Sequence, residues 1–96
     1  MIRHIVLFKL KSGVDDQTIQ RHMADFQELE GRVEAIDTIE VRRDFVGRDV
    51  SADFGLIVAF VDEAALKAYQ AHAEHQAAFG RLKPNLDRML VLDYHV

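Results

Sequence analysis

Two segments of the 96-residue chain repeat one short pattern, and this repeat constrains the fold more than any other feature. Residues 4–8 (His-Ile-Val-Leu-Phe) and 56–60 (Leu-Ile-Val-Ala-Phe) share Ile-Val-x-Phe in the same register. Each is followed by a helical pattern that begins at an aspartate, a favoured helix N-cap. The repeat predicts two related β-α-β halves. This is the ferredoxin-like α+β fold, in which the order βαββαβ gives a four-stranded antiparallel sheet. Coincidence between two ordinary apolar strands is the alternative.

The rest of the chain fits this order. Strands are expected at residues 2–11, 36–45, 54–61 and 88–95. A first helix is expected from Asp15 or Asp16 to Gly31, because apolar residues follow one another at intervals of three and four. A second helix is expected from Asp62, with an inner face of Leu66, Tyr69, His72/Ala73, Gln76 and Phe79. We therefore expect residues 1–96 to form a single domain.

Apolar residues occupy both faces of the strands, which limits what can surround the sheet. In the first strand Val6 and Phe8 point to one side, while Ile5 and Leu7 point to the other. The third and fourth strands lose alternation in the same way, as strands do when both faces are covered. Right-handed crossovers, however, put both helices on one face. We therefore expect a homodimer in which two copies pair through the sheet face opposite the helices.

Charge and composition exclude several classes of protein. The chain has 12 basic and 16 acidic residues, whereas a nucleic-acid-binding domain needs a clustered excess of Lys and Arg. The absence of cysteine excludes disulfides, thiolate catalysis and a Cys-based zinc site. No apolar run approaches the roughly 20 residues of a membrane span. The N-terminus leads directly into strand-like sequence, so we expect no signal peptide and a cytoplasmic protein.

Histidine and tyrosine stand where the pattern predicts apolar residues. His4 takes the place of Leu56 in the repeat. It is therefore either a core histidine bonded to a carbonyl or a tyrosine, or an acid–base group facing a cavity. On one helix, Tyr69, His72 and His75 are spaced by three and line one side. That side is either a polar helix shoulder or an acid–base cluster.

A metal site is the weaker interpretation of these histidines. His72 and His75 could chelate a metal from adjacent helical turns, but a site normally needs three or four protein ligands, and only His4 is available as a third. We therefore expect no metal and no cofactor. His22 and His95 are expected at the surface, without a role.

Four segments together carry a family resemblance: residues 1–11 (MIRHIVLFKLK), 53–60 (DFGLIVAF), 66–72 (LKAYQAH) followed by His75, and 90–94 (LVLDY). Through them the chain resembles the stress-responsive dimeric α/β-barrel (Dabb) family along nearly its whole length. The resemblance implies a ferredoxin-like subunit whose sheet packs on a second copy to form a barrel, with a pocket between sheet and helices. In a plant polyketide cyclase of this family, a tyrosine and a histidine carry an intramolecular aldol condensation. These match Tyr69 and His75, and a pocket-lining histidine of the first strand matches His4.

The chain departs from the family pattern at one position. The family commonly has His-Pro-x-His, whereas Ala73 stands here in the place of the proline. Proline favours a helix restart, while alanine permits the helix to run through. A continuous helix would change the direction in which His75 points.

Three functions follow as hypotheses. The first is a cofactor-independent enzyme, of the cyclase or isomerase kind, acting on a small apolar or aromatic carbonyl compound. His75 would remove a proton beside the carbonyl, Tyr69 would hydrogen-bond the enolate oxygen, and His4 would orient the substrate or Tyr69. The predicted pocket walls are Val6, Phe8, Met23, Phe26, Leu66, His72, Phe79 and Leu92.

The other two hypotheses do not depend on this acid–base scheme. One is a non-catalytic, stress-responsive homodimeric module that binds a small molecule or a protein partner. A filled or narrow pocket, in which Tyr69 and His75 are bonded to neighbouring groups, would favour it. The other is a cofactor-free monooxygenase or a haem-handling protein with His75 or His72 as haem ligand. It rests only on analogy with related dimeric α/β barrels.

Overall fold

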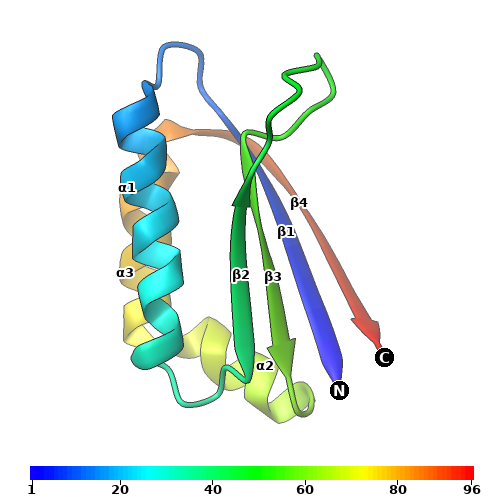
Figure 1. Ribbon diagram of the computed structural model, residues 1–96. Coiled ribbons are helices and arrows are strands. Elements are labelled where there is room, and N and C mark those ends of the chain that lie inside the picture. Colours follow the sequence, from blue (N-terminus) through cyan, green and yellow to red (C-terminus); the bar gives the residue numbers. More distant parts are fainter.

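The computed structural model describes residues 1–96 and has the ferredoxin-like fold that the repeat predicts (Figure 1). Its four-stranded antiparallel sheet has the order β2-β3-β1-β4, so the two strands that carry the repeat are the central pair, as expected. The elements in chain order are β1 (Ile2–Leu10), α1 (Asp16–Gln27), the 3₁₀ turn η1 (Glu28–Gly31), β2 (Thr38–Arg43), β3 (Phe54–Phe60), α2 (Glu63–Ala71), α3 (Ala73–Leu82), the 3₁₀ turn η2 (Lys83–Asn85) and β4 (Leu86–His95).

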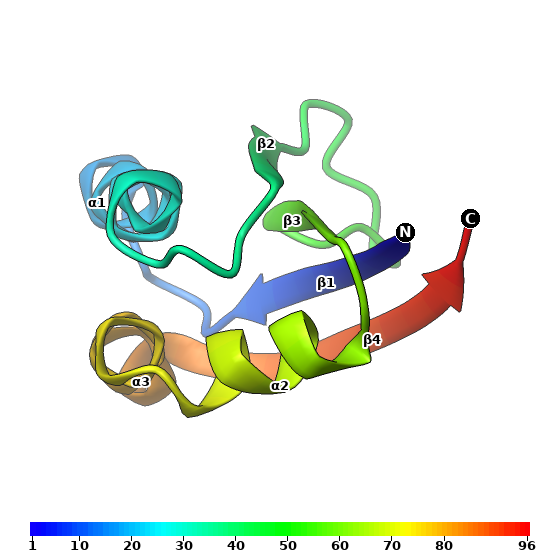
Figure 2. The ribbon, with the colours of Figure 1, turned by 90° about the horizontal axis from the view of Figure 1, so that it is seen from below.

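All three helices cover the same face of the sheet (Figure 2). The carboxylate of Asp15 caps α1 by accepting a hydrogen bond from the Thr18 amide. Phe26 on this helix then packs against Phe8 of β1 and Phe54 of β3, with ring centroids 5.4 and 6.3 Å away. These aromatic contacts hold α1 on the sheet and form one end of the core.

The other face of the sheet is apolar and uncovered. Leu90 and Leu92 of β4 are 69% and 58% exposed, and Leu7 and Ile57 are also exposed on the two central strands. Leu92 lies opposite Ile5 in the β1–β4 ladder, and Leu90 lies opposite Leu7. The predicted bare face is therefore present, and we call it the open sheet face.

The register of β4 corrects one site assignment. Leu92 was expected to line the pocket, but its pairing with Ile5 places it on the open sheet face. Met89 and Val91, opposite Phe8 and Val6, take the helix side instead. The assignment failed because both faces of this strand are apolar, and alternation alone does not say which face meets the helices.

The expectation of a continuous second helix is also wrong. α2 ends at Ala71 and α3 begins at Ala73, because His72 adopts an extended backbone with φ −67° and ψ 136°. The His72 side chain restarts the helix without a proline, since its Nδ1 accepts a hydrogen bond of 3.0 Å from the Glu74 amide. As a result Gln76 is exposed, and Ala78 and Leu82 form the buried side of α3.

His22 corrects a further expectation, because it is only 6% exposed although it was assigned to the surface. Its Nε2 accepts a hydrogen bond of 2.9 Å from the side-chain Nδ2 of Asn85 in η2. His95, by contrast, has an exposed side chain. The longest helix, α1, has 12 residues, and no helix could span a membrane.

Candidate active site

A cavity of about 250 Å³ lies between the sheet and the helices. Every strand and helix except β2 contributes to its wall, and most of the wall is apolar. Met89 and Val91 line it although they are 40% and 48% exposed, so the cavity reaches the surface along β4. The lining residues are His4, Val6, Phe8, Phe26, Leu56, Tyr69, Gln70, His75, Phe79, Met89 and Val91.

The structure brings together His4, Tyr69 and His75, the three predicted catalytic side chains, around this cavity. Four of the predicted wall residues also line it, namely Val6, Phe8, Phe26 and Phe79. The other four lie elsewhere. Met23 packs against the core, Leu66 borders a hollow near the end of β4, His72 caps α3, and Leu92 is on the open sheet face.

His4 owes its place to the pairing of the edge strand with β1. Asp93 is the direct cross-strand neighbour of His4 in the β1–β4 ladder, so both side chains project to the helix side. Their Nδ1 and Oδ1 atoms are 2.5 Å apart. Donation from Nδ1 to the carboxylate fixes the tautomer and leaves Nε2 as an acceptor. The sequence suggested a carbonyl or a tyrosine as the hydrogen-bond partner of a buried His4. The partner in the structure is the Asp93 carboxylate.

Asp93 is the polar residue that sequence reasoning missed. It is a polar residue within an apolar strand, Leu-Val-Leu-Asp-Tyr, and the same feature singles out His4 and Tyr69 in the sequence. Its relation to His4, 89 residues away, depends on the register of the sheet. Four residues of the cavity wall were also missed, because their places depend on the strand registers and on the turn of α2: Leu56, Gln70, Met89 and Val91.

The Tyr69 side chain is fully buried, yet its hydroxyl has no hydrogen-bond partner in the chain. Its ring lies edge-on to His4 with centroids 6.0 Å apart and contacts Phe60 at 5.1 Å. Burial raises the pKa of Tyr69, so the hydroxyl stays protonated across the physiological range. Tyr69, one of the residues that line the cavity, therefore carries a neutral O–H donor without a partner in the chain.

His75 packs against the Tyr69 ring, with the two ring centroids 4.4 Å apart. Its Nδ1 is also buried without a partner. Burial lowers the pKa of His75; the backbone of Gln70 opposes this effect, and His4 and His72 reinforce it. The ring is therefore neutral at neutral pH and can accept a proton.

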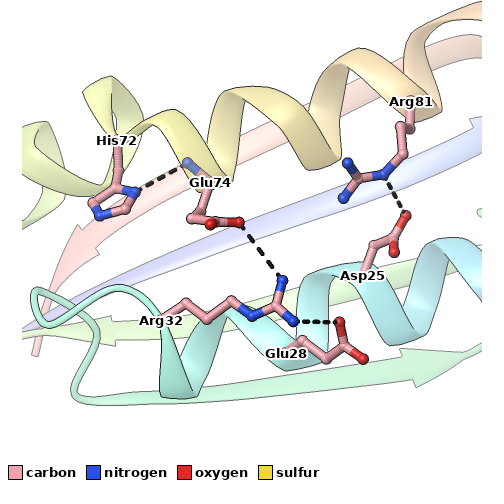
Figure 3. Close-up of polar contacts among 6 residues, drawn as sticks. All are labelled: Asp25, Glu28, Arg32, His72, Glu74 and Arg81. Atoms are coloured by element: carbon pink, nitrogen blue, oxygen red, sulfur yellow. Dashed lines mark hydrogen bonds and ion pairs between the residues drawn. The ribbon is translucent and has the colours of Figure 1, made fainter.

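Ion pairs attach α3, which carries His75, to α1 and η1 (Figure 3). Arg32 lies 3.6 Å from Glu74 and 3.5 Å from Glu28, while Arg81 lies 3.0 Å from Asp25. Exposed pairs of this kind contribute little stability individually. Together they join the two helices at both ends of α3.

The arrangement combines a neutral base, a neutral hydroxyl donor and a carboxylate-oriented imidazole in a small apolar chamber. Such a set can remove a proton from a bound compound and stabilise the oxygen on which charge develops. No group of three or more His, Asp or Glu side chains is placed to hold a metal ion.

Comparison with known proteins agrees with this architecture. The family model described as the stress responsive A/B barrel domain matches residues 2–96. An uncharacterised protein of Streptomyces coelicolor is 38% identical over 79 residues, which cover 80% of this chain and 81% of the relative. A crystal structure of a dimeric, ferredoxin-like protein of unknown function from Bacteroides fragilis is 28% identical, with a TM-score of 0.83 over 99% of this chain and 95% of that one.

One structural neighbour is a named enzyme. The hydroxynitrile lyase of Passiflora edulis has a TM-score of 0.86 over 99% of this chain and 92% of its own, but only 19% identity, so this likeness concerns the fold alone. The family model, in contrast, spans nearly every residue and is supported by the relative at 38% identity. The chain therefore belongs to the stress-responsive A/B barrel domain family.

Proposed function

We propose that this protein is an enzyme without a cofactor that moves a proton next to the carbonyl group of a small apolar compound. The observation that carries this proposal is the buried Tyr69 hydroxyl, which has no partner in the chain. The Tyr69 ring packs against the neutral His75, and both residues line an open cavity. A buried polar atom without a partner is costly in a folded protein. A bound oxygen atom would supply the missing partner.

Each polar group has one role in this scheme. A neutral nitrogen of His75 takes the proton from the carbon next to the carbonyl, and the electrons of the C–H bond form the carbon–carbon double bond of an enolate. The carbonyl electrons move onto the oxygen, where the Tyr69 hydroxyl donates a hydrogen bond. His75 then returns the proton at the same or another carbon. His4, held by Asp93, orients the bound compound or Tyr69.

General principles set the expected size of these contributions. A well-placed general base contributes about 10²–10⁴-fold in rate, and one hydrogen-bond donor to a developing oxyanion contributes about 10²–10³-fold. The apolar wall supports the same chemistry, because a low-dielectric chamber strengthens the hydrogen bond from Tyr69 to a charged oxygen.

The open cavity favours an enzyme over the non-catalytic module considered above. A module would be supported by a filled chamber in which Tyr69 and His75 are satisfied by neighbouring groups; here both have an unpartnered buried atom and the chamber has volume. The neighbour named as a hydroxynitrile lyase indicates that this fold can contain an active site.

The proposal includes a homodimer formed through the open sheet face. Its support is the contiguous apolar surface made by β1, β3 and β4, and the dimeric state named for the Bacteroides fragilis neighbour. Two-fold symmetry would let this surface pair with itself. The cavity, on the other side of the sheet, would remain accessible.

Exchange of carbon-bound protons in D₂O tests the enzyme proposal without knowledge of the natural product. Phenyl ketones, β-diketones and β-keto esters are incubated with the protein, and loss of the signal of the protons beside the carbonyl is followed by NMR. We expect exchange above the buffer rate for at least one compound, with a fall of about 10²-fold or more in Tyr69→Phe and His75→Gln.

The matched controls are Tyr94→Phe and His95→Gln, which make the same changes at exposed side chains. They should exchange at the wild-type rate. Equal rates in wild type, Tyr69→Phe and His75→Gln would refute the proposal. Compounds that bind, as judged by line broadening, but never exchange would instead support the non-catalytic module.

A further inference from the structure

The contact between Tyr69 and His75 depends on the break between α2 and α3. An α-helix turns by about 100° and rises by about 1.5 Å per residue. Tyr69 and His75 are six positions apart in the sequence. In one unbroken helix they would therefore be about 9 Å apart along the axis and would point in directions about 120° apart. Their ring centroids are nevertheless 4.4 Å apart. The extended backbone of His72 turns the chain between them and makes the contact possible (Figure 2).

The local sequence by itself favours closing this break. His72 stands between Ala71 and Ala73, and alanine is the strongest helix former. No proline prevents the helix from continuing. The structure holds the break through the His72 ring, whose Nδ1 accepts from the Glu74 amide, and through Arg32, which lies 3.6 Å from the Glu74 carboxylate (Figure 3).

We infer that His72 is a proton-sensitive positioning residue: its neutral ring holds the α2–α3 break and with it the Tyr69–His75 pair, and protonation releases both. This inference rests on the proposed function, because it assigns a regulation to that site. His72 takes no part in the chemistry itself, since it does not line the cavity.

The reason is the donor and acceptor inventory of imidazole. A neutral ring has one acceptor nitrogen, which here is Nδ1, whereas a protonated ring has two donors and no acceptor. Protonation therefore leaves the Glu74 amide without its cap. It also puts a positive charge at the N-terminus of α3, where the helix dipole disfavours cations.

The surroundings of His72 contain few other charges. The segment after η1 brings Arg32 and Glu34 to the same hollow, and α3 contributes Glu74 and, on its inner side, His75. The residues of α2 in this hollow are alanines: Ala64, Ala65 and Ala68. The ring therefore has one cationic and two anionic side chains around it.

Three substitutions of His72 distinguish the loss of the helix cap from the loss of the titrating ring. His72→Asn and His72→Asp keep an acceptor for the Glu74 amide that does not titrate between pH 5 and 8. His72→Ala removes the acceptor and leaves a run of three alanines. His95→Asn is the control at an exposed histidine.

NMR of the full chain gives a readout that does not depend on activity. In the wild type we expect the Glu74 amide shift to follow the titration of the His72 ring, and the Tyr69 and His75 ring protons to show a contact that weakens at acid pH. In His72→Asn the amide should no longer titrate and the ring contact should persist. In His72→Ala the ring contact should be weakened at all pH values, because the loss of one N-cap lowers the population of the broken helix about fivefold.

The proton-exchange assay gives the second readout. His72→Ala should lower the exchange rate about fivefold, the population change expected from loss of one N-cap. His72→Asn and His72→Asp should retain the wild-type rate at pH 8 and should lose less activity than the wild type in acid, because the cap in these variants does not titrate. A ring contact in His72→Ala that is as strong as in the wild type would overturn the inference.

The two proposals fail in different ways. If the wild type exchanges nothing, the proposed function is wrong, while the NMR contact still decides the role of His72. If the wild type exchanges but His72→Asn keeps the wild-type pH profile and a titrating Glu74 amide, only the inference about His72 is wrong. This last comparison also decides the matter if His72→Ala does not fold.

Discussion

Two buried polar atoms of the cavity, the Tyr69 hydroxyl and Nδ1 of His75, are left without partners by the rest of the chain. Leaving such a group unsatisfied costs a folded protein about 1–3 kcal/mol. A purely structural role would be served as well by phenylalanine at position 69. Retaining a hydroxyl here is typical of a site in which stability is given up for function.

Tyr69→Phe should therefore leave the free energy of unfolding unchanged or raise it by up to about 1 kcal/mol, because it removes an unsatisfied buried group and keeps the ring contacts. Urea unfolding, followed by circular dichroism at one fixed protein concentration, measures this. A loss of more than 1 kcal/mol in Tyr69→Phe would mean that the hydroxyl has a partner in the folded chain.

Part of the site could be predicted from single residues. His4, Tyr69 and His75 stand out because polar side chains at positions of an apolar pattern need a reason. Asp93 could not be paired with His4, and Leu92 could not be put on the correct face, because both depend on the register between β1 and β4. His22 was missed because one polar residue on an amphipathic helix resembles a surface residue until the neighbouring turn is known.

At the scale of elements, His22 connects α1 to the turn that precedes β4. Its Nε2 accepts from the Asn85 side chain, and the Asn85 carbonyl accepts from the Lys11 amide at the end of β1. One asparagine thus joins three parts of the chain. Burial lowers the pKa of His22; Asp25 opposes this effect, and Arg21 and Arg81 add to it.

A lowered pKa predicts a loss of stability in acid. The unfolded chain binds a proton at His22 near pH 6.5, whereas the folded chain binds it only at lower pH. The free energy of unfolding is therefore unaffected by His22 above about pH 6.5. It falls as the pH drops from there to the pKa of His22 in the folded chain. His22→Gln, which keeps an acceptor and does not titrate, should lose less stability between pH 8 and pH 5.

Urea unfolding of the wild type and His22→Gln at pH 8, 6.5 and 5 measures this difference. His95→Gln, altered at an exposed ring, serves as the control and should follow the wild type. Parallel curves for wild type and His22→Gln would show that His22 titrates alike in the folded and unfolded chains.

The elements themselves could largely be predicted, since the Ile-Val-x-Phe repeat and the two aspartate caps mark the strands and the helix starts. The break at His72 could not. Ala-His-Ala has no breaking residue, and the break is held by a side-chain cap and by Arg32, which comes from a distant part of the chain.

At the scale of the whole molecule, the open sheet face is the surface through which we propose that two copies associate. Its leucines and isoleucine form an apolar surface across three strands, which an isolated subunit would expose to water. The prediction of this face succeeded because it needed only two facts, apolar residues on both sides of the strands and helices on one side.

Leu92→Lys should convert the proposed dimer to a monomer, because an unpaired ammonium group cannot be buried between two sheets without a large desolvation cost. Light scattering after size exclusion should give twice the chain mass of 11.0 kDa for the wild type and 11.0 kDa for the variant. Gln20→Lys, on the exposed side of α1, should keep the wild-type mass. A wild type that elutes with the mass of one chain would disprove the dimer.

The strand β1 lies between the open sheet face and the cavity. Its odd-numbered residues Ile5 and Leu7 face the open side of the sheet, while His4 and Val6, one peptide bond away, face the chamber. A substitution that tilts one side of this strand must tilt the other. Assembly and chemistry in this small protein are therefore expected to drift together over evolution, with changes where two copies meet accompanied by changes in what the chamber accepts.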